Sequence, residues 1–202
     1  IAVPLDEGDR LAWVRPTSGE DQLIVATRQG MAIRFNETDA RVLGRTARGV
    51  RALNLEEDDI VVGMVPVMEN TTVLTVSENG QGRRTDPAEY RLQSRGGKGI
   101  KNYDTQKNGP VAGVLAVGEE DDVILISDDG IIIRIPVAEI STQSRYAGGV
   151  RVMRIGEGSR LVSLCRAPHE DEEEAAAESE APAEAETPAE ETADSTGTPV
   201  EE

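Results

Sequence analysis

One short stretch of the sequence concentrates residue types that could bind an anion. Gln93-Ser94-Arg95-Gly96-Gly97-Lys98-Gly99 holds two cations and three glycines in seven residues. Glycine lets the backbone adopt a positive φ and approach a partner closely, and the neighbouring cations supply charge to that partner. The pattern therefore indicates binding to a phosphate-rich surface. The alternative interpretation is a tight turn whose charges are solvated.

The stretch is one copy of an internal repeat with a period of fifty residues. Turn glycines stand at Gly30, Gly80 and Gly130, and an arginine follows each of them four residues later, without insertion over three copies. An arginine, a glycine and an apolar residue recur further along each unit: Arg45, Gly49 and Val50, then Arg95, Gly99 and Ile100, then Arg145, Gly149 and Val150. Residues 1–13 match the end of a further unit. A fixed period of this length is typical of repeat architectures.

Each unit is expected to form four short strands. In the first copy, strands over 24–27 and 32–35 flank a Gln-Gly turn, and the later copies use Asn-Gly and Asp-Gly, which favour tight hairpins. A strand over 49–55 is predicted next, then an acidic loop over 56–59 and a last strand over 60–65. Four-stranded units repeated in this way predict an all-β, propeller-like pinwheel that forms a partial ring. Such a partial ring would leave one or two blade faces uncovered.

The charge divides the chain into two parts. The 202 residues carry a formal net charge of -17, yet 14 of the 38 acidic residues and none of the 21 basic residues lie in 169–202. We therefore expect a repeat body over 1–168, with units at about 14–65, 66–115 and 116–168. The acidic segment 169–202 is too poor in apolar residues to order itself and is predicted to be a disordered tail.

Further observations on the sequence limit the class of protein. Cys165 is the only cysteine, so no intrachain disulfide can form, and its alignment with Val65 and Leu115 predicts a small core residue. No signal peptide and no apolar run of membrane-spanning length is present. The chain begins with Ile1 inside an expected strand, which indicates a piece of a longer protein. His169 is the only histidine and stands at the start of the tail, so a histidine-based metal site or general base is not expected.

The repeated pattern closely resembles the C-terminal domain found in the A subunit of DNA gyrase. The segment from Gln93 to Gly99 is similar to the box of that family, which has a glutamine, two basic residues, two glycines, a basic residue and a glycine; Ser94 replaces one basic residue here. The acidic tail after the last repeat is similar too. The resemblance implies a six-bladed pinwheel that wraps DNA around a basic rim, presents a neighbouring duplex for strand passage and so supports negative supercoiling. This chain would hold roughly the last half of that pinwheel.

The resemblance also implies the partners and the cellular setting. Double-stranded DNA would bind the body, the B subunit of gyrase would join the parent heterotetramer, and the acidic tail would either compete with DNA or only solubilise the chain. The parent enzyme would use ATP and Mg²⁺ on other domains or polypeptides, so no cofactor is expected in this chain. The localisation would be cytoplasmic and chromosome-associated, without a membrane.

No catalytic activity is expected of this chain alone. The DNA-breakage domain with its tyrosine is missing, although Arg145-Tyr146 mimics the arginine–tyrosine pair of type II topoisomerases. The repeat register aligns that pair with Arg95-Gly96 in a loop, so Tyr146 is not expected to be a nucleophile. Gly97-Lys98 resembles the end of a phosphate-binding loop but lacks its first glycine and the following Ser or Thr.

We predict that DNA is contacted by the repeated cations and glycines at the blade edge. Such a row would contact phosphates without reading sequence. The predicted contact residues are Arg45, Arg48, Gln93, Arg95, Gly96, Gly97, Lys98, Gly99, Lys101 and Arg145. The strand arginines Arg34, Arg84 and Arg134 are instead expected to pair with a carboxylate of a neighbouring blade. Two alternatives stay open: the equivalent domain in the A subunit of topoisomerase IV, and a propeller-type protein-interaction scaffold, which predicts apolar or aromatic anchors on the rim.

Overall fold

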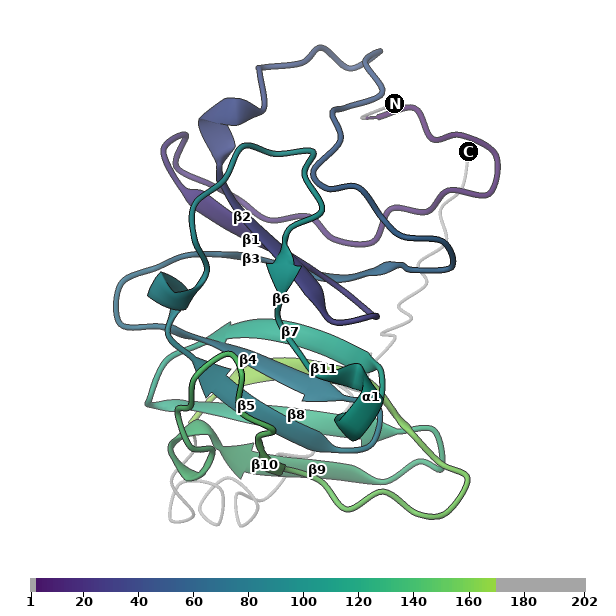
Figure 1. Ribbon diagram of the computed structural model, residues 1–202, viewed down its shortest axis with the longest axis vertical. Coiled ribbons are helices and arrows are strands. Elements are labelled where there is room, and N and C mark those ends of the chain that lie inside the picture. The colour runs from purple at the N-terminus through teal and green to yellow at the C-terminus, as the bar shows by residue number, and fades with distance from the viewer. Residues whose placement is uncertain (1–2, 170–202) are drawn as a thin grey trace, which may run out of the picture. The chain divides into compact units, whose positions relative to one another are not determined.

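Hairpins built around the repeated turn glycines open each of three antiparallel sheets (Figure 1). The structure is a computed structural model that describes residues 3–169. Gly30, Gly80 and Gly130 have φ of 85°, 76° and 85°, a backbone conformation that glycine adopts without strain. The three hairpins are β1 (Gln22–Thr27) with β2 (Met31–Asn36), β4 (Thr72–Ser77) with β5 (Gln81–Thr85), and β8 (Asp121–Ser127) with β9 (Ile132–Pro136). The all-β prediction and the predicted hairpins are confirmed.

A third strand in each sheet follows its hairpin along the chain. β3 (Val61–Pro66) pairs with β1, β7 (Val111–Val117) pairs with β4, and β11 (Leu161–Pro168) pairs with β8. The predicted last strand of each unit is therefore confirmed. The pairing of each of these strands shifts register once, so each pairing has a bulge or similar irregularity. The shift lies near the start of the third strand, beside the last residues of the first hairpin strand.

The fourth strand of a sheet comes from the unit that follows it. β6 (Ile100–Lys101) pairs with β2 of the preceding sheet, and β10 (Val150–Arg151) pairs with β5. The strand orders are β3-β1-β2-β6, β10-β5-β4-β7 and β11-β8-β9. The sequence predicted four strands for each unit without saying which strands pair, and the structure shows that the repeat exchanges one strand between neighbouring units.

The strand predicted over 49–55 is absent. Residues 49–55 form no strand, although their counterparts in the next two units form β6 and β10. Strand structure requires a paired edge, and β6 and β10 find that edge on the preceding sheet. Within residues 3–169 no sheet precedes the first unit, so this segment has no edge to pair with.

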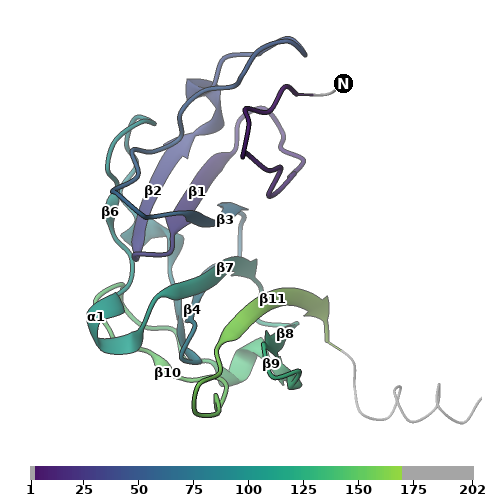
Figure 2. The same cartoon turned by 90° about the vertical axis from the view of Figure 1, so that its right-hand side faces the viewer.

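The core lies between successive sheets. One cluster joins the first and second sheets and includes Ile24 and Val73, and another joins the second and third and includes Leu74 and Leu125. Glycine permits close approach along the last strands: a Cβ on Gly63 would lie 2.5 Å from Val114 Cγ2. A Cβ on Gly113 would lie 2.4 Å from Leu164 Cδ2 in the same way, so β3, β7 and β11 follow one another at one end of their sheets (Figure 2).

Helical structure is minor in the described part of the chain. It consists of α1 (Thr105–Asn108) and the 3-10 turns η1 (Glu37–Asp39), η2 (Pro87–Glu89) and η3 (Val137–Glu139). No helix within residues 3–169 is long and apolar enough to cross a membrane. The predicted disorder of the acidic tail concerns residues that, apart from His169, lie outside the described range.

Cys165 corrects one prediction. Its counterpart Val65 is buried between the first and second sheets, whereas Cys165 is exposed on β11. The reason is position in the stack, because the third sheet is the last one described and no further sheet covers that face. Equivalent sequence positions therefore differ in burial at the two ends of a repeat array.

Candidate nucleic-acid interface

Three equivalent loops carry a local excess of positive charge. Segments 41–51, 91–101 and 141–151 contain four, four and two Arg or Lys residues and no Asp or Glu. The second and third of these loops end in β6 and β10, which lie at the opposite end of their sheets from β3 and β7 (Figure 2). The repeat therefore places the cations of the second and third loops, which have no acidic neighbours in sequence, at the edges of the first and second sheets. We call these three segments the basic loops.

Arg95 and Arg145 fasten their loops to the preceding basic loop. The Arg95 guanidinium donates to the carbonyl oxygens of Asp39 at 2.8 Å and Arg51 at 3.1 Å. The Arg145 guanidinium donates to the carbonyl oxygen of Lys101. The separation is 44 residues, the same as between Arg95 and Arg51. A carbonyl oxygen carries no net charge, so it does not neutralise the guanidinium. Arg95 and Arg145 therefore position the second and third basic loops and also keep a net positive charge on them.

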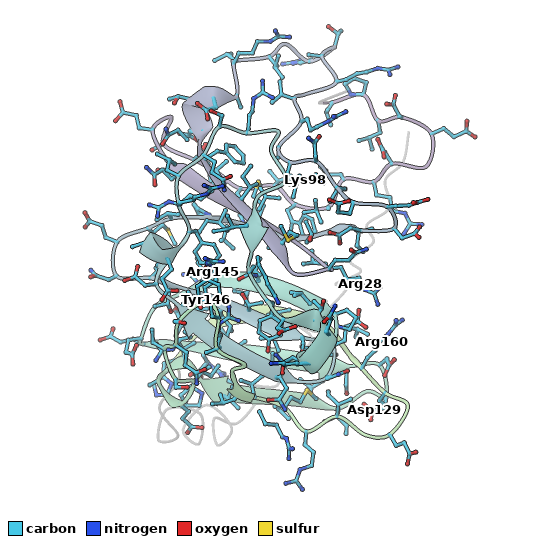
Figure 3. The ribbon with its side chains drawn as sticks, viewed as in Figure 1. Arg28, Lys98, Asp129, Arg145, Tyr146 and Arg160 are labelled. Atoms are coloured by element: carbon cyan, nitrogen blue, oxygen red, sulfur yellow. The ribbon has the colours of Figure 1, made fainter. Side chains whose placement is uncertain are left out.

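The lysines of the second basic loop form exposed ion pairs. Lys98 Nζ lies 2.7 Å from Glu56 Oε1, and this hydrogen bond raises the pKa of Lys98 above its usual value (Figure 3). Lys101 Nζ lies 3.5 Å from Asp104 Oδ2. In each pair the lysine side chain is more than half exposed. Exposed pairs of this kind contribute little stability, so their cations can exchange partners.

The first basic loop is the least engaged of the three. Arg48 NH1 lies 3.0 Å from Asp6 Oδ1, with both side chains mostly exposed. Arg45 occupies the position of Arg95 and Arg145, is exposed, and has no hydrogen-bond or ion-pair partner among residues 3–169. The structure thus gives Arg45 a different setting from its two counterparts.

The remaining predicted site residues shape the second loop. Gly96 has φ of 84°, and Gly99 has φ of 77° and lies against the Ala32 carbonyl. The Gln93 backbone N–H donates to the Arg34 carbonyl at 2.9 Å, and the Gly97 carbonyl accepts from Asn54 N at 2.9 Å. These residues fix the path of the loop. The structure brings the predicted site residues together on the basic loops, while their contact with DNA stays a prediction.

The strand arginines have the structural role that was expected. Arg84 pairs with the carboxylate of Glu119 in the neighbouring unit, as predicted, whereas Arg34 and Arg134 have partners of another kind. Arg84 Nε donates to the Ile140 carbonyl at 2.5 Å, and its NH2 donates to Glu119 Oε1 at 3.3 Å. Arg34 NH1 donates to the Pro87 carbonyl at 2.6 Å and its Nε to Gln22 Oε1 at 2.8 Å, so it uses carbonyl and amide oxygens. Arg134 Nε lies 2.7 Å from Asp122 Oδ2 of its own sheet.

A buried cation beneath the basic loops was not predicted from the sequence. Arg83 is fully buried and donates to the carbonyl oxygens of Ser144 at 3.0 Å, of Arg145 at 2.6 Å and of Asn102. Burial lowers the pKa of Arg83, and its guanidinium lies 4.9 Å from the centroid of the Tyr103 ring. The sequence did offer one indication of this role. Arg83 occurs in one repeat copy only, and a cation without repeat counterparts indicates a local partner.

Two tyrosines complete this buried network. Tyr90 OH donates to Asn102 Oδ1 at 2.6 Å, and burial raises the pKa of Tyr90. Tyr103 OH donates to the Gly148 carbonyl at 3.2 Å, and burial raises its pKa too. The network thereby connects β5 and β6 with the third basic loop, and it supports the loop backbone from below.

The sequence features that resemble catalytic sites, Arg145-Tyr146 and His169, have no supporting geometry in the described part of the chain. Tyr146 is exposed, and its ring lies 4.5 Å from the Arg145 guanidinium, which also donates to its hydroxyl at 2.8 Å (Figure 3). His169 Nδ1 lies 2.7 Å from Asp122 Oδ1. Among residues 3–169 no three His, Cys, Asp or Glu side chains are grouped to hold a metal ion.

Comparison with protein families identifies the repeat. The family described as DNA gyrase C-terminal domain, beta-propeller, matches residues 21–68, 71–117 and 121–164. These three matches follow the three sheets. Similar relatives are the DNA gyrase A subunit of Halalkalibacterium halodurans, 57% identical over 54 residues, and that of Clostridium acetobutylicum, 53% identical over 51 residues. The alignments cover 27% and 25% of this chain and 6% of each relative, so the chain matches a small part of those proteins.

Solved structures of two related domains share the fold. A DNA gyrase A C-terminal domain superposes with a TM-score of 0.67 at 32% identity, covering 73% of this chain and 50% of that one. A DNA topoisomerase IV C-terminal domain superposes with a TM-score of 0.78 at 23% identity, covering 88% of this chain and 56% of that one. The second likeness shows the fold alone, and both superpositions span about half of the solved domain.

Proposed function

The chain belongs to the DNA gyrase C-terminal domain family, and from this premise we propose that its basic loops bind and wrap double-stranded DNA. Contact is made with the phosphate backbone and is independent of base sequence. Within a complete gyrase the wrapped segment supports ATP-dependent negative supercoiling together with the B subunit. In this proposal the chain itself performs no bond chemistry and needs no cofactor.

The distribution of charge carries the proposal. Segments 41–51, 91–101 and 141–151 together hold nearly half of the chain's 21 basic residues and none of its 38 acidic residues. The repeat presents the cations of the second and third of these segments at the edge strands of two successive sheets. A row of cations that recurs once per sheet matches a repeating polyanion better than a compact ligand, because duplex DNA carries about one charge per 1.7 Å of its axis.

The ion pairs on these loops suit exchange with phosphate. Lys98–Glu56 and Arg48–Asp6 are exposed on both sides, and such solvent-screened pairs contribute little to stability. Replacement of a carboxylate by a phosphate therefore costs little stability. Counterions released from DNA then favour binding, which should fall steeply as salt rises.

Curvature of the DNA requires several contacts at once. Bending 20–30 base pairs by 40–90° costs on the order of 1–6 kcal/mol. Arg95 links the second basic loop to the first, and Arg145 links the third to the second. These hydrogen bonds hold the loops that carry the cations in place before DNA arrives. Fixed cations avoid part of the ordering cost of binding, which is the general advantage of preorganisation.

The acidic segment 169–202 is a proposed competitor for the same loops. It carries fourteen carboxylates and no Lys or Arg. A tethered polyanion competes at a high effective concentration, so the tail is proposed to weaken DNA binding at low salt. The compact unit ends at His169, so residues 1–169 are expected to bind duplex DNA more tightly than residues 1–202 at low salt, and equal binding would contradict competition by the tail.

The test is a salt series of binding to duplexes of unrelated sequence. Lys98→Gln with Lys101→Gln removes two cations from exposed ion pairs of the second basic loop. Arg160→Gln with Arg166→Gln is the matched control, since both arginines are also in exposed ion pairs but lie before and within β11. We expect the loop variant to bind every duplex more weakly with a salt slope reduced by roughly two. Equal loss in the control variant, or loss for one sequence only, would contradict the proposal.

A protein-interaction scaffold is the second candidate. Val42 and Tyr146, both on the basic loops, are exposed apolar or aromatic side chains of the kind that anchor protein partners. The same salt series separates the two functions. Absence of duplex binding by 1–169 at low salt would favour the scaffold.

A further inference from the structure

The third basic loop differs chemically from the other two. It carries two cations, Arg145 and Arg151, whereas each of the other basic loops carries four. Glu89 also lies against it, because Oε2 of this carboxylate accepts from the Arg145 backbone N–H at 2.7 Å. Phosphate binding depends on the number of cations available, so this loop has less to offer to a phosphate than the other two.

An exposed aromatic ring distinguishes the third basic loop. Tyr146 is 78% exposed, whereas the other two tyrosines of the chain, Tyr90 and Tyr103, are buried. The repeat has Thr46 and Gly96 at the same position of the preceding units. The fold of a unit therefore does not require a ring at this position, and packing does not account for it.

Arg145 holds the ring in place. Its guanidinium lies over one face of the Tyr146 ring, 4.5 Å from the centroid, and donates to the Tyr146 hydroxyl at 2.8 Å (Figure 3). The same guanidinium donates to the carbonyl oxygen of Lys101, which ties the stacked pair to β6. Because the Tyr146 side chain is mostly exposed, the opposite face of its ring is open to solvent.

The backbone beneath the ring is fixed as well. The Arg145 carbonyl accepts from the buried guanidinium of Arg83 at 2.6 Å. The Ala147 N–H donates to the Ser144 carbonyl at 3.0 Å and closes a turn, while the Tyr146 N–H donates to Ser144 Oγ at 3.3 Å. A side chain that is already ordered loses little further freedom when it binds, so the open ring face is a preorganised stacking surface.

We propose that the open face of Tyr146 stacks on one unpaired base of DNA that the basic loops hold. Every base has a flat π face, so stacking on an aromatic side chain tolerates any base sequence. Arg145 covers the other face of the ring. One open face suits a single base that has left the duplex, whereas a wedge between two stacked base pairs would need both faces. The inference rests on the proposed function, because the basic loops must first bring DNA to the ring.

Bending of the DNA supplies a reason why such a base would become available. Strain in curved DNA is relieved at flexible steps, which kink and unstack most easily. A base leaves the stack at the least cost where it is mismatched, damaged or already unpaired. Tyr146 would therefore give a sequence-independent binding surface a preference for weak points of the duplex, and it would place such points at the third basic loop.

Binding of the 202-residue chain to three duplexes of otherwise identical sequence tests the proposal. One duplex is intact, one carries a single bulged adenine, and one carries an abasic bulge at the same place. The two bulged duplexes share the interruption of the helix and differ in the base. We expect the unchanged chain to bind the adenine bulge roughly tenfold more tightly than the abasic bulge, because only adenine can stack on the ring.

Variants of the ring identify its role. Tyr146→Ala should bind the two bulged duplexes equally, and its affinity for the intact duplex should stay unchanged because it keeps every cation. Tyr146→Phe keeps the ring and should retain the preference for the adenine bulge. Val42→Ala is the matched control, since it removes another exposed apolar side chain from a basic loop, and it should retain the preference too.

A fluorescent adenine analogue in the bulge reports stacking directly. Its emission should be quenched when the unchanged chain binds and should stay high with Tyr146→Ala. Absence of binding to all three duplexes at low salt would overturn both this inference and the proposed function. Binding of the intact duplex without a preference for the adenine bulge, or a preference that survives in Tyr146→Ala, would overturn this inference alone and would favour a protein partner for the ring.

Discussion

Gly99 and Ala32 lie in contact where β6 pairs with β2, so closely that a Cβ on Gly99 would stand 2.3 Å from the Ala32 carbonyl oxygen. The two residues belong to different units, and their contact seats β6 against β2. The fold therefore depends on a glycine that recurs at the same position of each repeat unit and that also belongs to the basic stretch. The close contact is a packing requirement of the sheet, whether or not DNA is bound.

Gly99→Asn should lower the free energy of unfolding by about 1–3 kcal/mol, because the new side chain overpacks the contact between β6 and β2. Gly49→Asn is the matched variant at the equivalent position, where nothing lies within 4 Å. This variant should change the free energy of unfolding by less than about 0.5 kcal/mol. Denaturant unfolding of both variants gives the comparison, and equal losses would contradict this account of the contact between β6 and β2.

Arg28 and Glu78 should be energetically coupled across neighbouring units. They stand fifty residues apart and form two hydrogen bonds, Nε to Oε1 at 2.7 Å and NH2 to Oε2 at 3.1 Å. A double-mutant cycle with Arg28→Ala and Glu78→Ala should give a coupling of about 1 kcal/mol, because Arg28 is still partly solvated. The exposed pair Arg48–Asp6 should give a value near zero in the same cycle. Equal coupling in both pairs would contradict a role for partial burial.

Loss of the Arg83 guanidinium should be among the most damaging single changes. Arg83→Met would leave the carbonyl oxygens of Asn102, Ser144 and Arg145 without this donor in a buried site. Each unsatisfied buried group costs about 1–3 kcal/mol, so a total of about 3–5 kcal/mol is expected. Arg91→Met, an exposed change of the same type, should be nearly neutral. Thermal unfolding of the two variants would decide; similar melting temperatures would be evidence against the buried network.

The repeat period could predict much of this fold and only part of the site. It identified the turn glycines at Gly30, Gly80 and Gly130, since a positive φ and a hairpin signal are local properties. It could not show that Ile100 pairs with Ala32, because a period says which residues are equivalent and leaves open which unit a strand joins. Burial of Arg83 and exposure of Cys165 were hidden for the same reason, as both depend on the neighbouring sheet.

Stability should depend on pH through Glu119. The hydrogen bond from Arg84 lowers the pKa of Glu119, so this contact stabilises the folded state above the unfolded pKa and is lost as pH falls through the folded value. The stability gap between the unchanged chain and Glu119→Gln should therefore shrink between about pH 5 and pH 3. Urea unfolding at a series of pH values measures it. A gap that is constant over this range would show that ionisation of Glu119 does not matter.

Arg95 and Lys98 should separate the two tasks of the second basic loop. Arg95→Lys keeps the charge but loses the planar guanidinium that reaches the Asp39 and Arg51 carbonyls together, so it should lower the melting temperature. Its salt slope for duplex binding should stay unchanged, because the count of cations is unchanged. Lys98→Gln breaks only an exposed pair with Glu56, so it should leave the melting temperature within the range of neutral surface changes and reduce the salt slope by roughly one. An Arg95→Lys variant that melts at the same temperature as the unchanged chain would show that the Arg95 guanidinium does not fasten the loop.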